Sequence, residues 1–370
     1  MASLAVDISI GLIGLMVLWM GFIRIAEKAG VILWLAKLFS PLLCKLMPGI
    51  PKNHPAIASI TMNMTANMLG LDNAATPLGL QAMKDMQKLN PNPSVATDAQ
   101  IMFLVINTSS VTLFPITIFL YRAQQGAANP ADVFIPILLA TLTSTTIGLV
   151  LTCLVQKINL FQRAIFAYFI LISVFVFALI AHVATLSMDQ VGHFSNQLGS
   201  GLVLLLITFF LVAGVIKKVP LYDCFIDGAK SGLTISFRIL PYLLSMLIAI
   251  GLLRTSGVFD YILSGLSWFV SLFNIDTQFI EALPTALMKP FSGSGSRALM
   301  IDAMNQYGAD SFQGRLAALF QGSTDTTFYV LTVYFGSVGI RYGRHAVYCG
   351  LAADFAGFIA AIFLAYYFYG

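Results

Sequence analysis

The sequence predicts an all-α, polytopic integral membrane protein built from two repeats of inverted topology. The first observation is composition: 58% of the 370 residues are hydrophobic and 10% are charged, with a mean hydropathy of +0.86. Soluble domains carry about 25% charged residues, which argues against a soluble fold. The second observation is the distribution of positive charge between apolar segments. The third is a weak similarity between the two halves of the chain.

Eight apolar segments are long enough to cross a bilayer as helices, which takes about 20 residues. They cover residues 4–25, 99–121, 132–156, 164–186, 198–217, 231–253, 312–336 and 345–369. The remaining stretches, 26–98 and 254–311, are interrupted by Pro and Gly and contain the short apolar segments 56–70 and 277–291. Irregular backbone survives at membrane depth only inside protein or against water, so we expect these segments to be re-entrant or broken helices. Whether residues 30–46 and 257–274 also cross the membrane is open.

The Lys and Arg residues fall mainly on one side of this threading. If Met1 lies outside, only five of the 20 lie on the outer side, which leaves 15 inside. Positive residues concentrate in cytoplasmic loops, so we expect both termini on the outer side. The five exceptions are Arg122, Arg254, Lys289, Arg297 and Arg315.

The second half of the chain repeats the first in outline. Residues 20–24 followed by Gly30 resemble residues 250–254 followed by Gly257, and residues 107–114 align with 321–328 without a gap. Five crossings precede the second copy, and that odd number inverts it. We therefore expect repeats at 1–160 and 221–370, joined by a pair of transmembrane helices at 161–220. Inverted repeats with broken helices are a common plan for secondary transporters.

Motifs in both halves resemble a known family. The stretch NMTANMLGLDNAATPLG at 63–79 is similar to spore maturation protein A. The stretches KPFSGSGSR at 289–297 and GSTDTTFY at 322–329 are similar to spore maturation protein B. The chain resembles a fusion of the two, in a family that carries the nucleoside-recognition (Gate) domain. The resemblance implies a bacterial inner-membrane protein, with an A-like repeat at 1–160 and a B-like repeat at 221–370. In such a membrane the outer side, on which the charge distribution puts both termini, is the periplasmic side. It does not imply sporulation.

Polar clusters at the interruptions and within two of the spans are the candidate substrate-binding residues. Free N–H groups at a helix start bind anions and polar solutes, and an Arg adds donors suited to carboxylate or phosphate. The alternative is that these residues cap helix ends or join helices. The candidates are Asn63, Asn67, Asp72, Asn73, Asn107, Ser109, Ser292, Ser294, Ser296, Arg297, Gln321, Ser323, Thr324, Asp325 and Thr326.

Two carboxylates lie within apolar spans, Asp325 and Asp354. Ionisable groups inside a membrane mark ion pathways, proton relays or substrate contacts. We expect them to serve coupling to H⁺ or Na⁺, and Asp325 also to contact the solute. The structural alternative pairs Asp325 with Arg297 or has it cap a break at Gly322. The hydroxyl-rich run at 141–146 is more typical of hydrogen bonding between helices.

Other function classes find little support in the sequence. P-loop and Rossmann glycine patterns are missing, and the Gly-x-Ser-x-Gly spacing of a nucleophile elbow fails at 293–296. The four Cys and four His are scattered, so no metal or cofactor is expected, and no basic patch suggests nucleic acid. We expect a non-enzymatic secondary transporter of a small polar, nucleoside-like or anionic solute in a lipid bilayer. The rivals are a scaffold or maturation factor for cell-envelope or spore assembly and a membrane-embedded hydrolase; a homo-oligomer is open.

Overall fold

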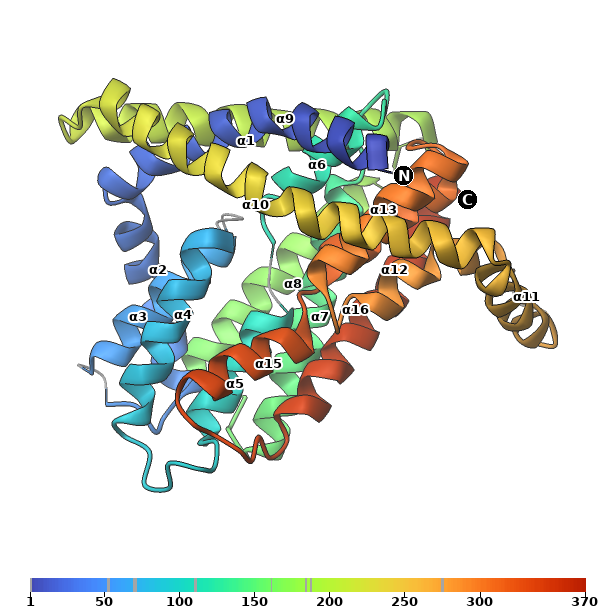
Figure 1. The fold of residues 1–370 in the computed structure, drawn as a ribbon. Helices are drawn as coiled ribbons and strands as arrows, with labels where there is room; N and C mark the ends of the chain where they lie inside the picture. The colour runs from blue at the N-terminus through green and yellow to red at the C-terminus, as the bar shows by residue number, and fades with distance from the viewer. Residues whose placement is uncertain are drawn as a thin grey trace.

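The computed structural model describes residues 2–370 apart from 52–53, 69–71, 110–111, 161, 184, 187 and 274–275. Within that part of the chain the regular structure is helical, with one isolated bridge between Val95 and Tyr342 (Figure 1). The all-α prediction is therefore confirmed. The first half and the linking pair contain α1 Ala2–Lys28, α2 Val31–Leu46, α3 Pro55–Met68, α4 Asp72–Gln87, α5 Asp98–Ser109, α6 Ile116–Gln124, α7 Phe134–Val155, α8 Arg163–Val183 and α9 Met188–Ile216. The second half contains α10 Leu221–Thr255, α11 Val258–Ser271, η1 Gln278–Ala282, α12 Leu283–Met288, α13 Gly293–Tyr307, α14 Phe312–Ser323, α15 Thr327–Ser337 and α16 Ala346–Tyr369.

Several helices suit a bilayer. Among the described residues, three helical stretches are long and apolar enough to cross one: α7, residues 192–216 of α9, and α16. Large apolar side chains are exposed along them, such as Leu204 and Leu205 on α9 and Phe363 on α16. Apolar surface of this extent is stable against lipid and not against water. The protein is therefore a membrane protein with a helical, polytopic architecture.

The first helices of the two halves form one antiparallel seam, α1 against α10 (Figure 1). A Cβ placed on Gly228 would come within 2.2 Å of the Met20 carbonyl oxygen, and one on Gly232 within 2.7 Å of the Met16 carbonyl oxygen. The residue number of the contact on α1 decreases as the residue number on α10 increases, so the two helices run antiparallel. Small residues four apart let helix backbones approach closely, as here.

The turn after each of these helices uses the same backbone device. Gly30 before α2 has φ 76°, and Gly257 before α11 has φ 74°. This left-handed conformation is open to glycine at little cost and strained for other residues. The similarity between residues 20–30 and 250–257 thus has a structural cause, because both helices end in the same bend.

Two of the predicted spans are broken helices, which corrects the sequence interpretation of 99–121 and 312–336 as continuous. The first is divided into α5 and α6, with Pro115 immediately before α6. The second is divided into α14 and α15, where Thr324 is extended and the Asp325 Oδ1 accepts the Thr326 N–H at 2.7 Å. Proline removes a backbone donor, and a local side-chain acceptor competes with the helix, so both segments stop near their middle.

The segments expected to be re-entrant or broken helices are short helices followed by an interruption and a further helix. In the first half α3 packs along α4: the Ser59 hydroxyl donates to Asp85 at 2.8 Å, and the Asn63 side chain donates to the Ala75 carbonyl at 2.7 Å. In the second half α12 is followed by α13 after an interruption at 289–292. The long helices α7 and α16 cross between the halves, where Gly148 lies against Ala353.

Candidate functional site

A polar cavity of about 100 Å³ lies where four interruptions of the chain meet. Two belong to the hairpins, at the end of α3 and between α12 and α13. Two belong to the broken helices, between α5 and α6 and between α14 and α15. The lining residues are Asn67, Thr112, Phe114, Pro115, Thr117, Ile118, Lys289, Gly293, Arg297, Gln321, Gly322, Thr324 and Asp325. Both halves of the chain therefore build one site.

The two broken helices touch at their breaks. The Asp325 N–H donates to the Thr108 carbonyl at 2.7 Å, and the Thr324 hydroxyl lies 2.9 Å from the same oxygen. Thr108 is in the last turn of α5, where helix carbonyls lack partners within the helix. The break between α14 and α15 thus supplies hydrogen-bond donors to a carbonyl at the end of α5.

Asp325 lines the cavity, and its carboxylate also holds the backbone of the break through the Thr326 N–H. Arg297 lines the same cavity, and its guanidinium lies 5.5 Å from the centroid of the Tyr121 ring. Such a stacked cation is held in place by the ring face.

Asp354 is fully buried on α16, beside the cavity rather than on its wall. One carboxylate oxygen contacts the Thr324 hydroxyl, and the other accepts the Thr327 hydroxyl at 2.7 Å. Thr324 has a single hydroxyl proton and contacts two acceptors, the Thr108 carbonyl and this carboxylate. Asp354 on α16 therefore holds both sides of the break between α14 and α15, through Thr324 and Thr327.

The Ser-rich interruption before α13 is mainly structural. The Ser292 Oγ caps α13 by accepting the Gly295 N–H at 3.0 Å, and Ser294 lies 3.2 Å from the Ser292 hydroxyl. Ser296 is buried and donates to the Thr285 carbonyl on α12 at 2.8 Å. Gly293 lines the cavity, and a Cβ there would come within 2.9 Å of the Thr326 hydroxyl. The motif brings the start of α13 against the break after α14.

The predicted residues of the first half divide between the cavity and its support. Asn67 lines the cavity and donates to the Asn107 side chain at 2.8 Å, and Asn107 donates in turn to the Phe103 carbonyl. Asn63 is buried in the hairpin, 3.4 Å from the Tyr334 hydroxyl. The side chains of Asp72 and Asn73 lie outside the described residues.

Hydroxyl groups of α7 support the first break. The Thr145 hydroxyl donates to the Ser109 carbonyl at 3.2 Å, and the Thr141 hydroxyl donates to the same oxygen at 3.4 Å. Ser109 itself bonds back to Ile106. The interpretation of the 141–146 run as a device for helix-to-helix bonding is confirmed.

Gln321 is the most unusual polar residue of the cavity. It is 8% exposed, and its Oε1 has no hydrogen-bond partner among the described residues. An unpaired buried acceptor costs about 1–3 kcal/mol, so natural structures rarely keep one without a reason. Its neighbours Ser323 and Thr326 are buried, and Ser323 bonds back to the Phe320 carbonyl.

Sequence reasoning missed Lys289, which is 5% exposed and lines the cavity. It also missed Thr117 on the wall, and it included Thr112 and Thr327 in the polar runs of the two spans without assigning either a contact. A signal for Lys289 was present, because it is one of the five positive residues on the outer side of the threading. Two of those five line the cavity, and two more form a buried network.

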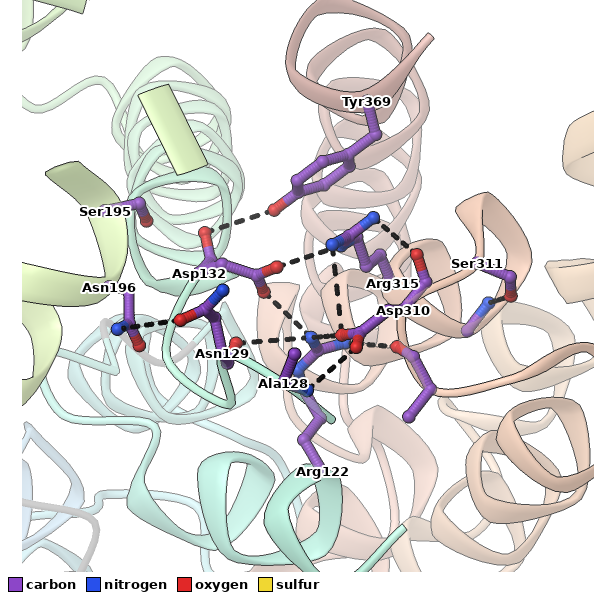
Figure 2. Close-up of polar contacts among 12 residues, drawn as sticks. Arg122, Ala128, Asn129, Asp132, Ser195, Asn196, Asp310, Ser311, Arg315 and Tyr369 are labelled. Carbon is purple, nitrogen blue, oxygen red and sulfur yellow. Dashed lines mark hydrogen bonds and ion pairs between the residues drawn. The ribbon is translucent and has the colours of Figure 1, made fainter. Parts of the chain in front are cut away.

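That network joins α6, α14 and the loops beside them (Figure 2). Arg122 is fully buried; its guanidinium lies 2.9 Å from the Asp132 carboxylate and 3.0 Å from that of Asp310. Arg315 Nε lies 2.9 Å from Asp132, and its guanidinium lies 4.9 Å from the centroid of the Tyr369 ring. We call this cluster the Arg122 end. Arg254, the fifth outer residue, has a side chain outside those described.

The opposite end of the same helix pair joins the start of α5 to the segment after α15. Ala96 N–H donates to the Tyr342 carbonyl at 3.0 Å, and Arg344 forms an ion pair with Asp98 at 2.7 Å. Gln156 bonds to the Asp98 carbonyl and to His345. We call this cluster the Arg344 end. The broken helices therefore run antiparallel, with the Arg122 end at one extremity of the pair and the Arg344 end at the other.

Comparisons with known proteins agree with the motifs in both halves. The model of the nucleoside recognition (Gate) family matches residues 9–124 and 236–341, so that it covers α5–α6 and α14–α15 alike. Spore maturation protein B of Bacillus subtilis (strain 168) is 45% identical over 169 residues, which is 46% of this chain and 93% of that protein. Spore maturation protein A of the same organism is 44% identical over 143 residues, which is 39% of this chain and 73% of that protein. No solved structure matches the chain. The chain belongs to the nucleoside recognition (Gate) family and is related to spore maturation proteins A and B.

Proposed function

We propose that the chain is a secondary transporter of a small polar, nucleoside-like or anionic solute, which binds in the cavity between the two halves. The observation that carries the proposal is the convergence of four chain interruptions on one polar cavity. Helix ends that point into a cavity at the middle of an inverted repeat are the usual solute site of such transporters. The proposal places the protein in the bacterial inner membrane, with both termini on the outer side.

The charges of the cavity support this proposal. Lys289, Arg297 and Asp325 line one small space among apolar helices. Charged groups at membrane depth are costly, and they persist where they serve a pathway. A scaffold has no need for them at the junction of two broken helices. The proposal requires no cofactor and no catalytic residue.

Asp325 and Asp354 are the groups we propose for coupling to H⁺ or Na⁺. Asp325 lines the cavity, and Asp354 contacts the hydroxyl of Thr324, which also lines the cavity. An ion or proton bound at either carboxylate would change how the break between α14 and α15 is held. Such a differential contact is what couples two binding events.

Uptake by proteoliposomes tests the transport proposal. Purified chain is first screened by thermal shift against nucleosides, small carboxylates and inorganic phosphate, since a bound solute stabilises the folded state. The stabilising solute is then supplied with a proton or sodium gradient. We expect uptake to depend on the gradient and to be lost in Asp325→Asn, which keeps an oxygen to accept the Thr326 N–H.

The matched control is Asp223→Asn, which makes the same change at an exposed site in the first turn of α10. It should leave uptake unchanged. Equal uptake by Asp325→Asn and the unaltered chain would count against the proposed site. Turnover of a solute without any gradient would favour the membrane-embedded hydrolase instead.

A second candidate function is a non-transporting maturation factor that acts through partner proteins in cell-envelope or spore assembly. The printed names of the relatives, spore maturation proteins A and B, favour it. It predicts that Asp325→Asn supports assembly as well as the unaltered chain does. Retained complementation together with absent uptake would select this candidate.

A further inference from the structure

Asp354 is the centre of a cluster of hydrogen-bonded oxygens beside the cavity, which we call the Asp354 cluster. One of its carboxylate oxygens contacts the Thr324 hydroxyl, which in turn lies 2.9 Å from the Thr108 carbonyl oxygen. The other carboxylate oxygen lies 2.7 Å from the Thr327 hydroxyl. Asp354, Thr108 and Thr327 are 0%, 1% and 0% exposed, so bulk water does not reach these oxygens.

The Asp354 cluster is short of one proton if Asp354 is ionised. The Thr324 oxygen lies close to two others, the Asp354 Oδ1 and the Thr108 carbonyl oxygen, but it carries a single proton. The Thr108 carbonyl has none to give, and the Thr327 hydroxyl is directed at the other carboxylate oxygen. The missing proton can come from Asp354 itself, because a neutral carboxyl group donates through its O–H. Asp354 then donates to Thr324, and Thr324 donates to Thr108.

The surroundings of Asp354 favour this neutral form. A buried carboxylate charge is costly unless it is paired. The helices α5 and α7, which pack against α16, present the uncharged groups of Thr108 and Ser144 to this part of it. The charged groups that act on Asp354 are Lys289 and Asp325, which have opposite signs and line the cavity together. Lys289 therefore has an opposite charge in the cavity whether or not Asp354 is ionised.

The spacing of the Asp354 cluster suits a proton and not a metal ion. The separations of 2.9 Å and 2.7 Å lie in the range of an O–H···O hydrogen bond, about 2.5–3.0 Å. A hard metal ion needs several oxygens that converge on one point with their lone pairs free. In the Asp354 cluster the hydroxyls are directed at neighbouring oxygens instead, and neither Asp354 nor Thr327 lines the cavity.

We propose that Asp354 binds the coupling proton and that this proton closes the joint between the two broken helices. The inference rests on the proposed function, because it names the ion that drives transport at the same site. Loss of the proton leaves Thr324 with one proton for two acceptors. A carboxylate is the stronger acceptor, so Thr324 keeps its bond to Asp354 and loses its bond to the Thr108 carbonyl at the end of α5. The Asp325 N–H is then left to hold that carbonyl, and the joint is weaker.

Infrared difference spectroscopy of the purified full chain in detergent tests the inference. A protonated carboxyl group has a C=O stretch that is distinct from the bands of carboxylates and amides. We expect such a band at neutral pH, and we expect it to be lost in Asp354→Asn. The Asn side chain can donate to Thr324 and accept from Thr327, so this variant keeps the contacts of the cluster.

The matched control for the spectra is Asp223→Asn, which makes the same change at an exposed position on α10. This variant should keep the protonated-acid band of the unaltered chain. Identical spectra for the unaltered chain and Asp354→Asn in this region overturn the inference.

Two substitutions of Thr324 test the contact that receives the proton. Thr324→Val removes the hydroxyl with little change of shape, whereas Thr324→Ser keeps it. The band should shift in Thr324→Val and keep its position in Thr324→Ser. A band that is unaffected by both changes overturns the role of the proton in closing the joint. If Thr324→Val does not fold, the spectra of the unaltered chain and Asp354→Asn still decide whether Asp354 holds the proton.

Exchange of choline chloride for sodium chloride at constant pH separates the two coupling ions. A proton site keeps its band in both salts, which is the expected result. Loss of the band when Na⁺ is added overturns the inference, because Na⁺ would then displace the proton. Uptake that a sodium gradient drives without any pH gradient also overturns it.

The outcomes separate this inference from the transport proposal. A protonated Asp354 together with uptake that follows a pH gradient supports both. A protonated Asp354 without uptake of any solute supports the proton site and counts against transport. Uptake by a chain that lacks the band overturns the inference and leaves transport standing, and the absence of both overturns both.

Discussion

The Arg122 end and the Arg344 end occupy equivalent places in the two halves, yet they are closed by different means. Each joins the start of one broken helix to the end of the other. At the Arg122 end, the side chains of Arg122 and Asp132 are 0% and 3% exposed. At the Arg344 end, those of Arg344 and Asp98 are 42% and 53% exposed. The same position in the repeat therefore holds a buried network in one copy and an exposed pair in the other.

The difference shows which end is easier to open. Exposed ion pairs contribute about 0–1 kcal/mol, whereas removing one partner of a buried network costs far more. The Arg344 end also borders a hollow of about 310 Å³, lined partly by Thr97, Asp98 and Gln156. We therefore expect the Arg344 end to separate first in any opening of the cavity. Four predictions test this contrast.

The largest effect should follow Arg122→Met. The change leaves Asp132 and Asp310 without their buried cation, and the backbone carbonyl of Ala309 loses a donor at 2.7 Å. We expect a loss of about 3–5 kcal/mol in the free energy of unfolding. Denaturant titration of the purified chain measures it. A loss of less than about 1 kcal/mol in the free energy of unfolding would mean that the Arg122 end is no more stable than the Arg344 end.

Arg315→Gln should have an intermediate effect. Arg315 gives Asp132 a second charge-assisted bond at 2.9 Å, but its side chain is 24% exposed and Arg122 remains. We expect about 1.5–3 kcal/mol, the range for a hydrogen bond to a charged group. The same titration measures this variant. A loss as large as that of Arg122→Met would show that the two arginines act as one unit.

Arg344→Gln should cost little. Its ion pair with Asp98 is largely exposed to solvent and therefore screened. We expect a change of at most about 1 kcal/mol in the free energy of unfolding. Hydrogen exchange at residues 94–98 should nevertheless become faster, since the local contacts are weaker. Unchanged exchange there would argue against opening at this end.

The smallest effect concerns pH. Burial and then the nearby charge of Arg344 lower the pKa of His345, although Asp98 opposes the shift. The unfolded chain then takes up the proton more readily, so stability is full above the ordinary His pKa of about 6.5 and falls as the pH drops through it. Melting curves from pH 8 to pH 5 measure the fall. His345→Gln should flatten it, and identical curves for both chains would refute the expectation.

Much of the architecture could be predicted from composition, hydropathy and repeat signals. The bends at Gly30 and Gly257 lie where the two halves are similar, and Asp325 and Arg297 line the cavity. The breaks within 99–121 and 312–336 were missed because both stretches are apolar enough overall to count as full spans, and the polar runs at 107–112 and 321–327 were interpreted as side chains of continuous helices. The last carbonyl of α5, at Ser109, accepts hydroxyls from α7, which is distant in sequence, and Pro115 lies immediately before α6. A local pattern cannot contain that information.

The five Lys and Arg residues that depart from the positive-inside pattern were more informative about the site than the fifteen that follow it. The positive-inside rule was used to choose the orientation with most Lys and Arg inside, and the five exceptions were given no role of their own. Lys289, Arg297, Arg122 and Arg315 are all such exceptions, and the structure places each of them in the cavity or in a buried network. The partners of the network, such as Asp310, are nearly 190 positions away from Arg122 in sequence, which no motif could connect.

The close seam between α1 and α10 has a mechanical consequence. Where Gly228 meets Met20 and Gly232 meets Met16, the glycines lie directly against main-chain carbonyls of α1 and have no side chain of their own to rearrange. Packed backbone of this kind resists sliding, because any shift would drive a carbonyl into a helix. The seam can therefore serve as a stationary reference. Spectroscopic labels on α1 and α10 should keep a constant separation, while the separation of labels on α5 and α15 should change when the cavity opens.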